Sequence, residues 1–288
     1  MNPVPVEVKR NISFAVEDRI GIIGIGLIGA SLGLSLKKRN LCGKITGFGR
    51  NKETLQKAKE IGAVDQTTDS LEEIANNDII FLAVPVLSIV EVGKNLARYV
   101  ENAIVADVGS TKKIIVDELS LAIPKFIGCH PMAGSHKKGP EFAKDGLFKD
   151  AVVVITPIEK TDIPSKNTIK NLWEKLDAKI IEISPDEHDR LVSLSSHIPH
   201  IVSNILVELV GKNCLISSGF HSMARLALSD PLLWRDIFIT NRENIIIGLE
   251  KMEKNIVKWK DIMNDEKALM NHLDEINRLA KEVFYGED

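Results

Sequence analysis

A glycine-rich turn between an apolar run and a helical stretch constrains the fold of this chain more than any other feature. Residues 24–29 read Gly-Ile-Gly-Leu-Ile-Gly. Gly24 allows a tight turn, Gly26 leaves room for a pyrophosphate against the backbone, and Gly29 lets the helix pack closely on the strand. The turn predicts a dinucleotide-binding loop formed by Gly24, Gly26, Leu27, Ile28 and Gly29. The alternative is a strand-to-helix turn that binds no ligand.

Short β-rich runs alternate with helical stretches from about Arg19 to Ile183, as in a parallel sheet covered by helices. The runs are Arg19 to Gly24, Lys44 to Phe48, Ile79 to Val84, Ala103 to Val108, Lys125 to Cys129, Ala151 to Thr156 and Lys179 to Ile183. Most are unbroken, which is typical of strands buried on both faces. The pattern predicts an α/β fold with a Rossmann-type dinucleotide-binding domain over residues 18–183, preceded by a tail, residues 1–17.

The β-rich runs stop after Ile183, and the rest of the chain has helical signals. Ser184-Pro185-Asp186-Glu187 and Asp230-Pro231 are helix starts, each with a capping residue before a proline. Apolar residues then recur at alternating spacings of four and three, in the manner of a helix-packing seam. These residues are Ile245, Leu249, Met252, Ile256, Trp259 and Met263, with Leu269, Leu273, Ile276 and Ala280 in the last helix. We expect an all-α dimerisation domain over residues 184–288 and a homodimer, although an intrachain partner would also explain the seams.

Composition excludes several classes of protein. The net charge is -3 and no segment is dominated by basic side chains, which argues against a nucleic-acid partner. The longest apolar run, Ile79 to Val84, is far too short for a membrane span, and the N-terminus lacks the apolar core of a secretory signal, so we expect a cytoplasmic protein. The three cysteines are widely spaced, and we expect neither disulfides nor a metal site.

The end of the second apolar run is the position that usually reads the cofactor ribose, where NAD-selective proteins place an acidic residue. Here the sequence Phe48-Gly49-Arg50-Asn51 offers no acid. Gly49 leaves space and Arg50 can pair with a 2′-phosphate, which favours NADP or dual use over NAD alone. The alternative for Arg50 is a solvated loop charge.

A histidine follows the fifth apolar run, in the segment Cys129-His130-Pro131. The carboxyl ends of parallel strands are the edge at which such sheets bind ligands, and a near-neutral imidazole suits proton transfer. The stretch from Asp107 to Lys112 ends the preceding run and can bring the Ser110 hydroxyl to the same crevice. The alternatives are a structural histidine and a turn in which Ser110 caps the next helix.

Two further segments in the helical part carry candidate binding residues. Ser196-His197-Ile198-Pro199-His200 places two histidines beside a proline that can bend the helix toward a cleft. Arg225 stands among small and apolar residues, where a partly buried guanidinium needs a carboxylate or phosphate partner. Satisfied histidines at a kink and an internal salt bridge are the alternatives.

Together and in this order, these motifs resemble the prephenate and arogenate dehydrogenases of tyrosine biosynthesis. The resemblance runs from about Arg19 to Met263. Its most specific parts are residues 107–112, His130-Pro131-Met132-Ala133-Gly134, residues 196–200, residues 219–225 and Ser229-Asp230-Pro231-Leu232-Leu233-Trp234-Arg235-Asp236. The resemblance implies oxidative decarboxylation, with hydride transfer from a cyclohexadienol to NAD or NADP and loss of its carboxylate as carbon dioxide.

The resemblance also implies roles for single residues. His130 acts on the C4 hydroxyl, Ser110 hydrogen-bonds to that hydroxyl and to His130, Arg225 binds a substrate carboxylate, and His197 orients the substrate. Trp234 resembles a tryptophan that the family presents near the active site from the partner subunit, with an interface aromatic as the alternative. Asp107 joins the cofactor-binding candidates, and His200 joins the substrate-binding ones and favours prephenate over arogenate.

Three positions depart from the family pattern. His136 stands where some relatives carry glutamate, Ser222 where many have an acidic residue, and Gly49-Arg50 replaces the acidic ribose reader. A substrate with two carboxylates needs local positive groups, for which His136, Lys137, Lys138, His221 and Arg225 are candidates. The rival functions are arogenate dehydrogenase, another dehydrogenase with a helical domain such as a β-hydroxyacid dehydrogenase or imine reductase, and a non-catalytic dinucleotide sensor.

Overall fold

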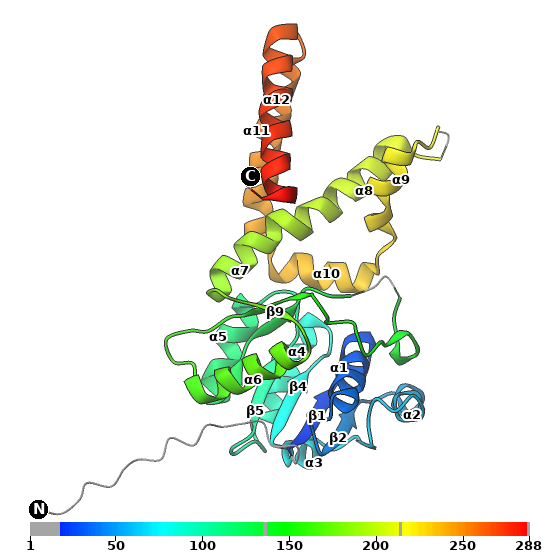
Figure 1. Cartoon of the computed structure of the whole chain (residues 1–288), viewed down its shortest axis with the longest axis vertical. Coiled ribbons are helices and arrows are strands. Elements are labelled where there is room, and N and C mark those ends of the chain that lie inside the picture. The colour runs from blue at the N-terminus through cyan, green and yellow to red at the C-terminus, as the bar shows by residue number, and fades with distance from the viewer. Residues whose placement is uncertain (1–17, 135–136, 213–214, 287–288) are drawn as a thin grey trace, which may run out of the picture. The chain divides into compact units, whose positions relative to one another are not determined.

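A computed structural model describes residues 18–134, 137–212 and 215–286 (Figure 1). The chain divides into two compact units, one reaching to Asn241 and the other beginning at Arg242. Each unit is described by itself.

The first unit is built on a six-stranded parallel sheet with the strand order β3-β2-β1-β4-β5-β6. The strands are β1 (Arg19–Ile23), β2 (Lys44–Phe48), β3 (Gln66–Thr68), β4 (Ile79–Leu82), β5 (Ile104–Asp107) and β6 (Phe126–Ile127). This is the Rossmann order, which reverses direction between β1 and β4 and opens a ligand crevice at the carboxyl ends of these strands. The predicted α/β fold is confirmed. The short, polar strand β3 carries no apolar signal and was not predicted.

A second sheet of three strands corrects the prediction of one continuous parallel sheet. It has the order β7-β8-β9, with β7 (Cys129–Pro131) antiparallel to β8 (Val152–Ile155) and β9 (Lys179–Glu182) parallel to it. The run predicted as one strand, Lys125 to Cys129, divides at Gly128 between the two sheets. A Cβ atom at Gly128 would lie 2.4 Å from Thr156 Oγ1, so the backbone approaches its neighbour here as only glycine allows.

Helices cover both faces of the main sheet, as Figure 1 shows. They are α1 (Leu27–Lys38), α2 (Lys52–Glu60), α3 (Leu71–Ala75), α4 (Val86–Leu96), α5 (Lys113–Ala122) and α6 (Ile163–Lys175). On β1, Ile20 and Ile22 belong to a core cluster with α1 and α6, whereas Ile23 belongs to a second cluster with α3, α4 and α5. Alternate residues of a strand point to opposite faces, so the unbroken apolar run serves both clusters.

The predicted helix starts after Ile183 are confirmed. Ser184 Oγ accepts a hydrogen bond from Glu187 N (3.2 Å) at the start of α7 (Pro185–Val192), and Asp230 Oδ1 accepts from Leu232 N (3.0 Å) at the start of α10 (Pro231–Thr240). Between them lie a π-helical turn (Ser193–His197), α8 (Ile198–Val210), α9 (Ser218–Ala224) and a 3₁₀ turn (Arg225–Leu228). The π turn directly precedes the proline at the start of α8 and marks the predicted irregularity.

The second unit is a hairpin of α11 (Arg242–Ile262) and α12 (Glu266–Tyr285), which lie side by side (Figure 1). Apolar residues of the predicted seams stay exposed in the single chain, with Ile256 55%, Met263 68% and Leu273 43% accessible. None of the helices in the described residues has the length and apolar character of a membrane span.

Candidate functional site

The glycine turn has the geometry that a dinucleotide loop needs. Gly24 has a φ of +96°, which side chains disfavour, and a Cβ atom on Gly29 would lie 2.1 Å from Gly24 O. A Cβ atom on Gly26 would meet no protein atom within 4 Å, so the space beside Gly26 is open. Leu27 and Ile28 begin α1, and the first amides of a helix have no partner within the helix. The loop therefore fits a pyrophosphate at the N-terminus of α1.

A matched pair of glycine variants separates this cradle from the packing of α1. Gly26→Ala is expected to weaken dinucleotide binding by roughly tenfold or more, a loss of about 1.4 kcal/mol, and to leave stability nearly unchanged. Gly33→Ala puts a Cβ atom 2.1 Å from Ala63 O and should lower the free energy of unfolding by about 1–3 kcal/mol. Fluorescence titration and urea unfolding check the pair, and full-affinity binding by Gly26→Ala would contradict the cradle.

Gly49 and Arg50 follow β2 at the same edge of the sheet. A Cβ atom on Gly49 would lie 3.3 Å from Leu55 Cδ2, so little space exists for a larger residue. Arg50 is exposed and has no hydrogen bond or ion pair within the part of the chain that the structure describes. Its guanidinium is therefore free to meet a ligand.

A buried ion pair joins the ends of β5 and β7. Lys112 and Asp107 are both fully buried, and Lys112 Nζ donates to Asp107 Oδ2 and to Cys129 O (2.8 Å). Asp107 also accepts hydrogen bonds from Gly109 N (2.8 Å) and Cys129 N (3.2 Å). Asp107 was predicted to bind the cofactor, but its carboxylate accepts hydrogen bonds from groups of the protein itself. Through the bond from Cys129 N it holds the backbone next to His130.

His130 on β7 is hydrogen-bonded to a second histidine that the sequence analysis missed. Its Nδ1 lies 2.8 Å from His188 Nε2, and His188 Nδ1 lies 2.7 Å from Asp189 Oδ1. The two rings meet edge to face, with centroids 5.0 Å apart. His188 and Asp189 are at most 1% exposed. The arrangement is a buried chain of two imidazoles and a carboxylate that ends on His130.

A signal for this pair exists in the sequence. The buried residues of α7 are Pro185, His188, Asp189 and Val192, at the i, i+3, i+4 and i+7 spacing of a core-facing stripe. Two polar residues on such a stripe need partners inside the protein. From its sequence, the segment was predicted only as a helix start.

His130 is held in its neutral form. Burial is the largest cause and lowers its pKa well below the usual 6.5, and the neighbouring His188, Lys112 and His197 add to the shift. A neutral imidazole at physiological pH can accept a proton, so His130 is in the state that a general base requires.

Ser110 lies between Asp107 and Lys112 in the chain but does not make the predicted hydrogen bond to His130. His130 Nδ1 is paired with His188, and no hydrogen bond of Ser110 is found among the described residues. Ser110 does not cap α5 either, because that helix begins at Lys113 with Lys112 as its capping position. Its partly exposed hydroxyl stays available to a ligand.

His197, His200 and Trp234 form an aromatic group within one chain. Trp234 stacks on His200, with centroids 3.3 Å apart, and meets the edge of His197 at 6.0 Å. Asn241 Nδ2 lies 3.1 Å from His197 Nδ1 and donates to Asp189 O (2.7 Å). The structure thus brings the predicted His197, His200 and Trp234 together and ties them to the segment that holds His188.

These histidines make the stability of the first unit dependent on pH. Burial lowers the pKa of both His197 and His200 from 6.5 to about 4. Between these values the unfolded chain binds more protons, so stability is full above 6.5 and falls as the pH decreases to 4, by about 3 kcal/mol for the more deeply buried His197 and by less for the more solvated His200. Melting curves should show this decline, and His200→Phe should make it shallower. An identical slope in the variant would contradict the assignment.

Arg225 differs from the prediction of a partly buried guanidinium. It begins the 3₁₀ turn after α9, is exposed, and has no salt bridge in the described ranges. His221 is exposed as well, Lys138 pairs with Asp230, and Lys137 lies over the Phe142 ring. His136 lies outside the described residues.

The fold and the site define a class of protein. A Rossmann sheet presents an open glycine loop at its carboxyl edge, a neutral histidine lies on β7 directly after that sheet, and a helical region follows. Among the described residues, no group of three or more His, Cys, Asp or Glu side chains is placed to hold a metal ion. These features are those of a nucleotide-binding dehydrogenase.

Comparisons with known proteins identify the family. Residues 32–182 match the model of the prephenate dehydrogenase nucleotide-binding domain, and residues 184–278 match that of the prephenate dehydrogenase dimerization domain. The prephenate dehydrogenase of Bacillus subtilis is 34% identical, over 88% of this chain and 72% of that protein. The prephenate dehydrogenase of Lactococcus lactis is 31% identical, over 93% and 78%. The chain belongs to the prephenate dehydrogenase family.

Solved structures agree with this result. The prephenate dehydrogenase of A. aeolicus, crystallised with hydroxyphenyl propionate and NAD+, superposes with a TM-score of 0.88 at 32% identity and covers 92% of this chain and 98% of its own. Synechocystis arogenate dehydrogenase superposes with a TM-score of 0.82 at 30% identity and covers 92% and 99%. Both substrates named in the resemblance are therefore represented among its relatives.

Proposed function

We propose that this protein is a prephenate dehydrogenase, which converts prephenate to 4-hydroxyphenylpyruvate by oxidative decarboxylation. The observation that carries the proposal is the neutral His130 on β7, the strand that follows the Rossmann sheet along the chain. The same chain has an open glycine loop at the carboxyl edge of that sheet and belongs to this family. When bound, NAD or NADP supplies the acceptor for the hydride that leaves C4 of the substrate. Gly24, Gly26, Leu27, Ile28 and Gly29 would hold its pyrophosphate.

The residues of the chain divide the remaining work. His130 accepts the proton of the C4 hydroxyl as C4 is oxidised, and the bond from C1 to the carboxylate breaks to release carbon dioxide. The electron pair of that bond completes the aromatic ring, which provides the driving force, and His130 then returns the proton to the phenolate oxygen to give the hydroxyl of the product. Ser110 donates a hydrogen bond to the same hydroxyl, His197 and His200 orient the substrate beside Trp234, and Arg225 binds a substrate carboxylate.

The proposal is tested by the absorbance of the reduced dinucleotide, with prephenate or arogenate combined with NAD or NADP in all four pairings. Turnover with prephenate above that with arogenate supports the assignment. Preference for arogenate would make the protein an arogenate dehydrogenase. This is the second candidate function, because the similar Synechocystis protein is an arogenate dehydrogenase. No turnover in any pairing, with dinucleotide binding confirmed, would overturn the proposal in favour of a rival dehydrogenase or a sensor.

We propose further that Arg50 favours NADP or dual use of both dinucleotides. Its exposed guanidinium has no partner among the described residues and follows the strand at which the ribose is read. Arg50→Ala is expected to weaken NADP binding by roughly ten- to a hundredfold, since a charge-assisted contact contributes about 1.5–3 kcal/mol, and to leave NAD binding nearly unchanged. Lys57→Ala, an exposed substitution further along α2, is the matched control. Equal losses for both dinucleotides would refute the assignment.

We also propose that the protein is a homodimer formed through the helical region. The support is the match of residues 184–278 to a dimerization domain together with the exposed apolar residues of α11 and α12, including Ile256, Leu273 and Ile276. Light scattering during gel filtration should give twice the chain mass, and Ile276→Glu should shift that mass toward the monomer. A monomeric unmodified protein would contradict the proposal.

A further inference from the structure

His188 and Asp189 are buried away from solvent, yet His188 is hydrogen-bonded to His130. Asp189 is anchored at the beginning of α5, where its Oδ1 accepts a hydrogen bond from Lys112 N (2.7 Å) and its Oδ2 accepts from Lys113 N (3.0 Å). The same Oδ1 faces His188 Nδ1 at 2.7 Å. The carboxylate is therefore fixed in place before the imidazole chain begins.

We propose that His188 and Asp189 are positioning residues that fix the tautomer of His130, so that its Nδ1 carries the proton and its Nε2 is the base. This proposal rests on the proposed function for its catalytic consequence only. The protonation pattern itself is a property of the free protein.

The pattern follows from the donors and acceptors along the chain. An ionised carboxylate only accepts, so His188 Nδ1 must carry a proton and donate it to Asp189. In a neutral imidazole the other nitrogen is then an acceptor, and His188 Nε2 presents a lone pair to His130 at 2.8 Å. A second lone pair on His130 Nδ1 would oppose it, so His130 Nδ1 carries the proton.

The surroundings of His130 favour this arrangement over one with a second proton on His188. Three groups that are positive or can become so face His130: His188 from α7, Lys112 from the start of α5, and His197 from the π turn. Lys112 already carries a charge that Asp107 balances. A further positive charge on His188 would lie beside it in a region where both histidine neighbours are buried.

The arrangement matches what the reaction requires of the base. In the proposed step the hydrogen–oxygen bond of the C4 hydroxyl breaks and a bond from the proton to His130 Nε2 forms. The imidazolium so produced keeps its Nδ1 proton directed at His188, and the negative Asp189 lies one ring further away. The carboxylate stabilises this charge through His188, as the aspartate of a serine-protease triad does through direct contact.

The first test measures the tautomer itself without substrate or dinucleotide. Long-range proton–nitrogen spectra of the whole protein, with ¹⁵N-labelled histidine, distinguish a protonated from an unprotonated ring nitrogen, and the His130 signals are assigned by their loss in His130→Gln. We expect a protonated Nδ1 and an unprotonated Nε2 on His130 at neutral pH, and the same pattern on His188. A protonated Nε2 on His130 would overturn the proposal.

The second test uses variants of the pair. Asp189→Asn keeps the acceptor for Lys113 N but puts an amide donor in place of Oδ1, which faces His188 Nδ1 and Lys112 N, and so reverses the pattern along the imidazole chain. We expect His130 to change tautomer and kcat to fall by roughly ten- to a hundredfold, as for other partners that orient a functional histidine, with KM and dinucleotide affinity little changed. His188→Leu should lower kcat similarly, and His188→Gln, which retains an acceptor for His130, should recover part of it.

Two matched controls separate orientation from a general loss of structure. Asp186→Asn changes an exposed carboxylate in the same turn of α7, where it pairs with Lys113, and His272→Gln changes a histidine of α12 that contacts Trp259 of α11. Both should leave kcat and the His130 tautomer unchanged. An Asp189→Asn protein that keeps the tautomer and the kcat of the unmodified protein would overturn the proposal. Failure of the proposed function would instead appear as absent turnover with the expected tautomer in place.

Discussion

A His130→Asn variant is expected to turn over its substrate roughly two to four decades more slowly than the unmodified protein, the usual contribution of a general acid or base. Asparagine can contact a hydroxyl group but cannot take its proton at neutral pH. The dinucleotide affinity should stay nearly unchanged, because the glycine loop is formed by the segment between β1 and α1.

The control for this variant is His272→Asn, which removes an imidazole from the second unit. His130→Asn should lose kcat, measured by absorbance, whereas His272→Asn should keep it. Both variants should keep the dinucleotide affinity, measured by fluorescence. Because burial and its neighbours lower the pKa of His130 below 6.5, kcat/KM of the unmodified protein should be constant around pH 7 and fall only under acidic conditions. Near-normal turnover by His130→Asn would remove His130 from the mechanism.

The largest loss of stability is expected for Lys112→Met. This change leaves the fully buried Asp107 without its positive partner, which typically costs about 3–5 kcal/mol. It also removes the donor to Cys129 O, the carbonyl next to His130. The free energy of unfolding in urea measures the loss, and combining Lys112→Met with Asp107→Asn should recover part of it because position 107 then carries no unpaired charge.

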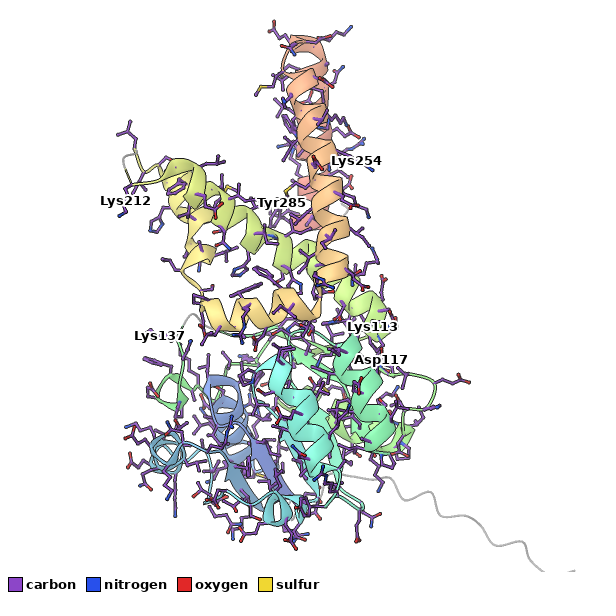
Figure 2. All side chains as sticks on the ribbon, turned by 180° about the vertical axis from the view of Figure 1, so that it is seen from behind. Lys113, Asp117, Lys137, Lys212, Lys254 and Tyr285 are labelled. Atoms are coloured by element: carbon purple, nitrogen blue, oxygen red, sulfur yellow. The ribbon has the colours of Figure 1, made fainter. Side chains whose placement is uncertain are left out.

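Lys113→Met is the matched control at the next position of the chain. Lys113 is 49% exposed and forms surface ion pairs with Asp186 and with Asp117, which is labelled beside it in Figure 2. Such exposed pairs contribute about 0–1 kcal/mol, so this variant should unfold almost like the unmodified protein. Equal losses for Lys112→Met and Lys113→Met would contradict the account of the buried pair.

Features that depend on neighbouring residues were predicted well from the sequence. The turn at Gly24 and the caps at Ser184 and Asp230 are local, because the backbone geometry or the capping hydrogen bond involves residues within three positions. The strands of the Rossmann sheet were predicted for a related reason, since burial on both faces leaves an unbroken apolar run.

Features that depend on distant residues were not predicted. The split at Gly128 arises from its close approach to Thr156, and the partner of His130 is 58 positions away. Trp234 is stacked on His200 of the same chain, a contact that the sequence did not predict. Arg225 was expected in a partly buried place because its neighbours are small and apolar, yet a short 3₁₀ turn leaves it exposed.

The site therefore combines predicted residues with an unpredicted support. His130, His197 and His200 were selected from their positions after a strand or beside a proline. The pair that connects them, His188 and Asp189, lies on the buried stripe of α7. The sequence of this segment is also that of an ordinary helix start, so it did not indicate a site. Only the packing of α7 against the start of α5 shows that these polar side chains serve His130.

The central claim is that hydride transfer and loss of the carboxylate occur together in this protein. The most direct measurement is the amount of carbon dioxide released per reduced dinucleotide formed, with prephenate labelled with ¹³C at its ring carboxylate. We expect equimolar carbon dioxide and reduced dinucleotide, together with 4-hydroxyphenylpyruvate. Reduced dinucleotide formed without carbon dioxide would contradict it and would indicate a dehydrogenase that oxidises an alcohol and leaves the carboxylate in place.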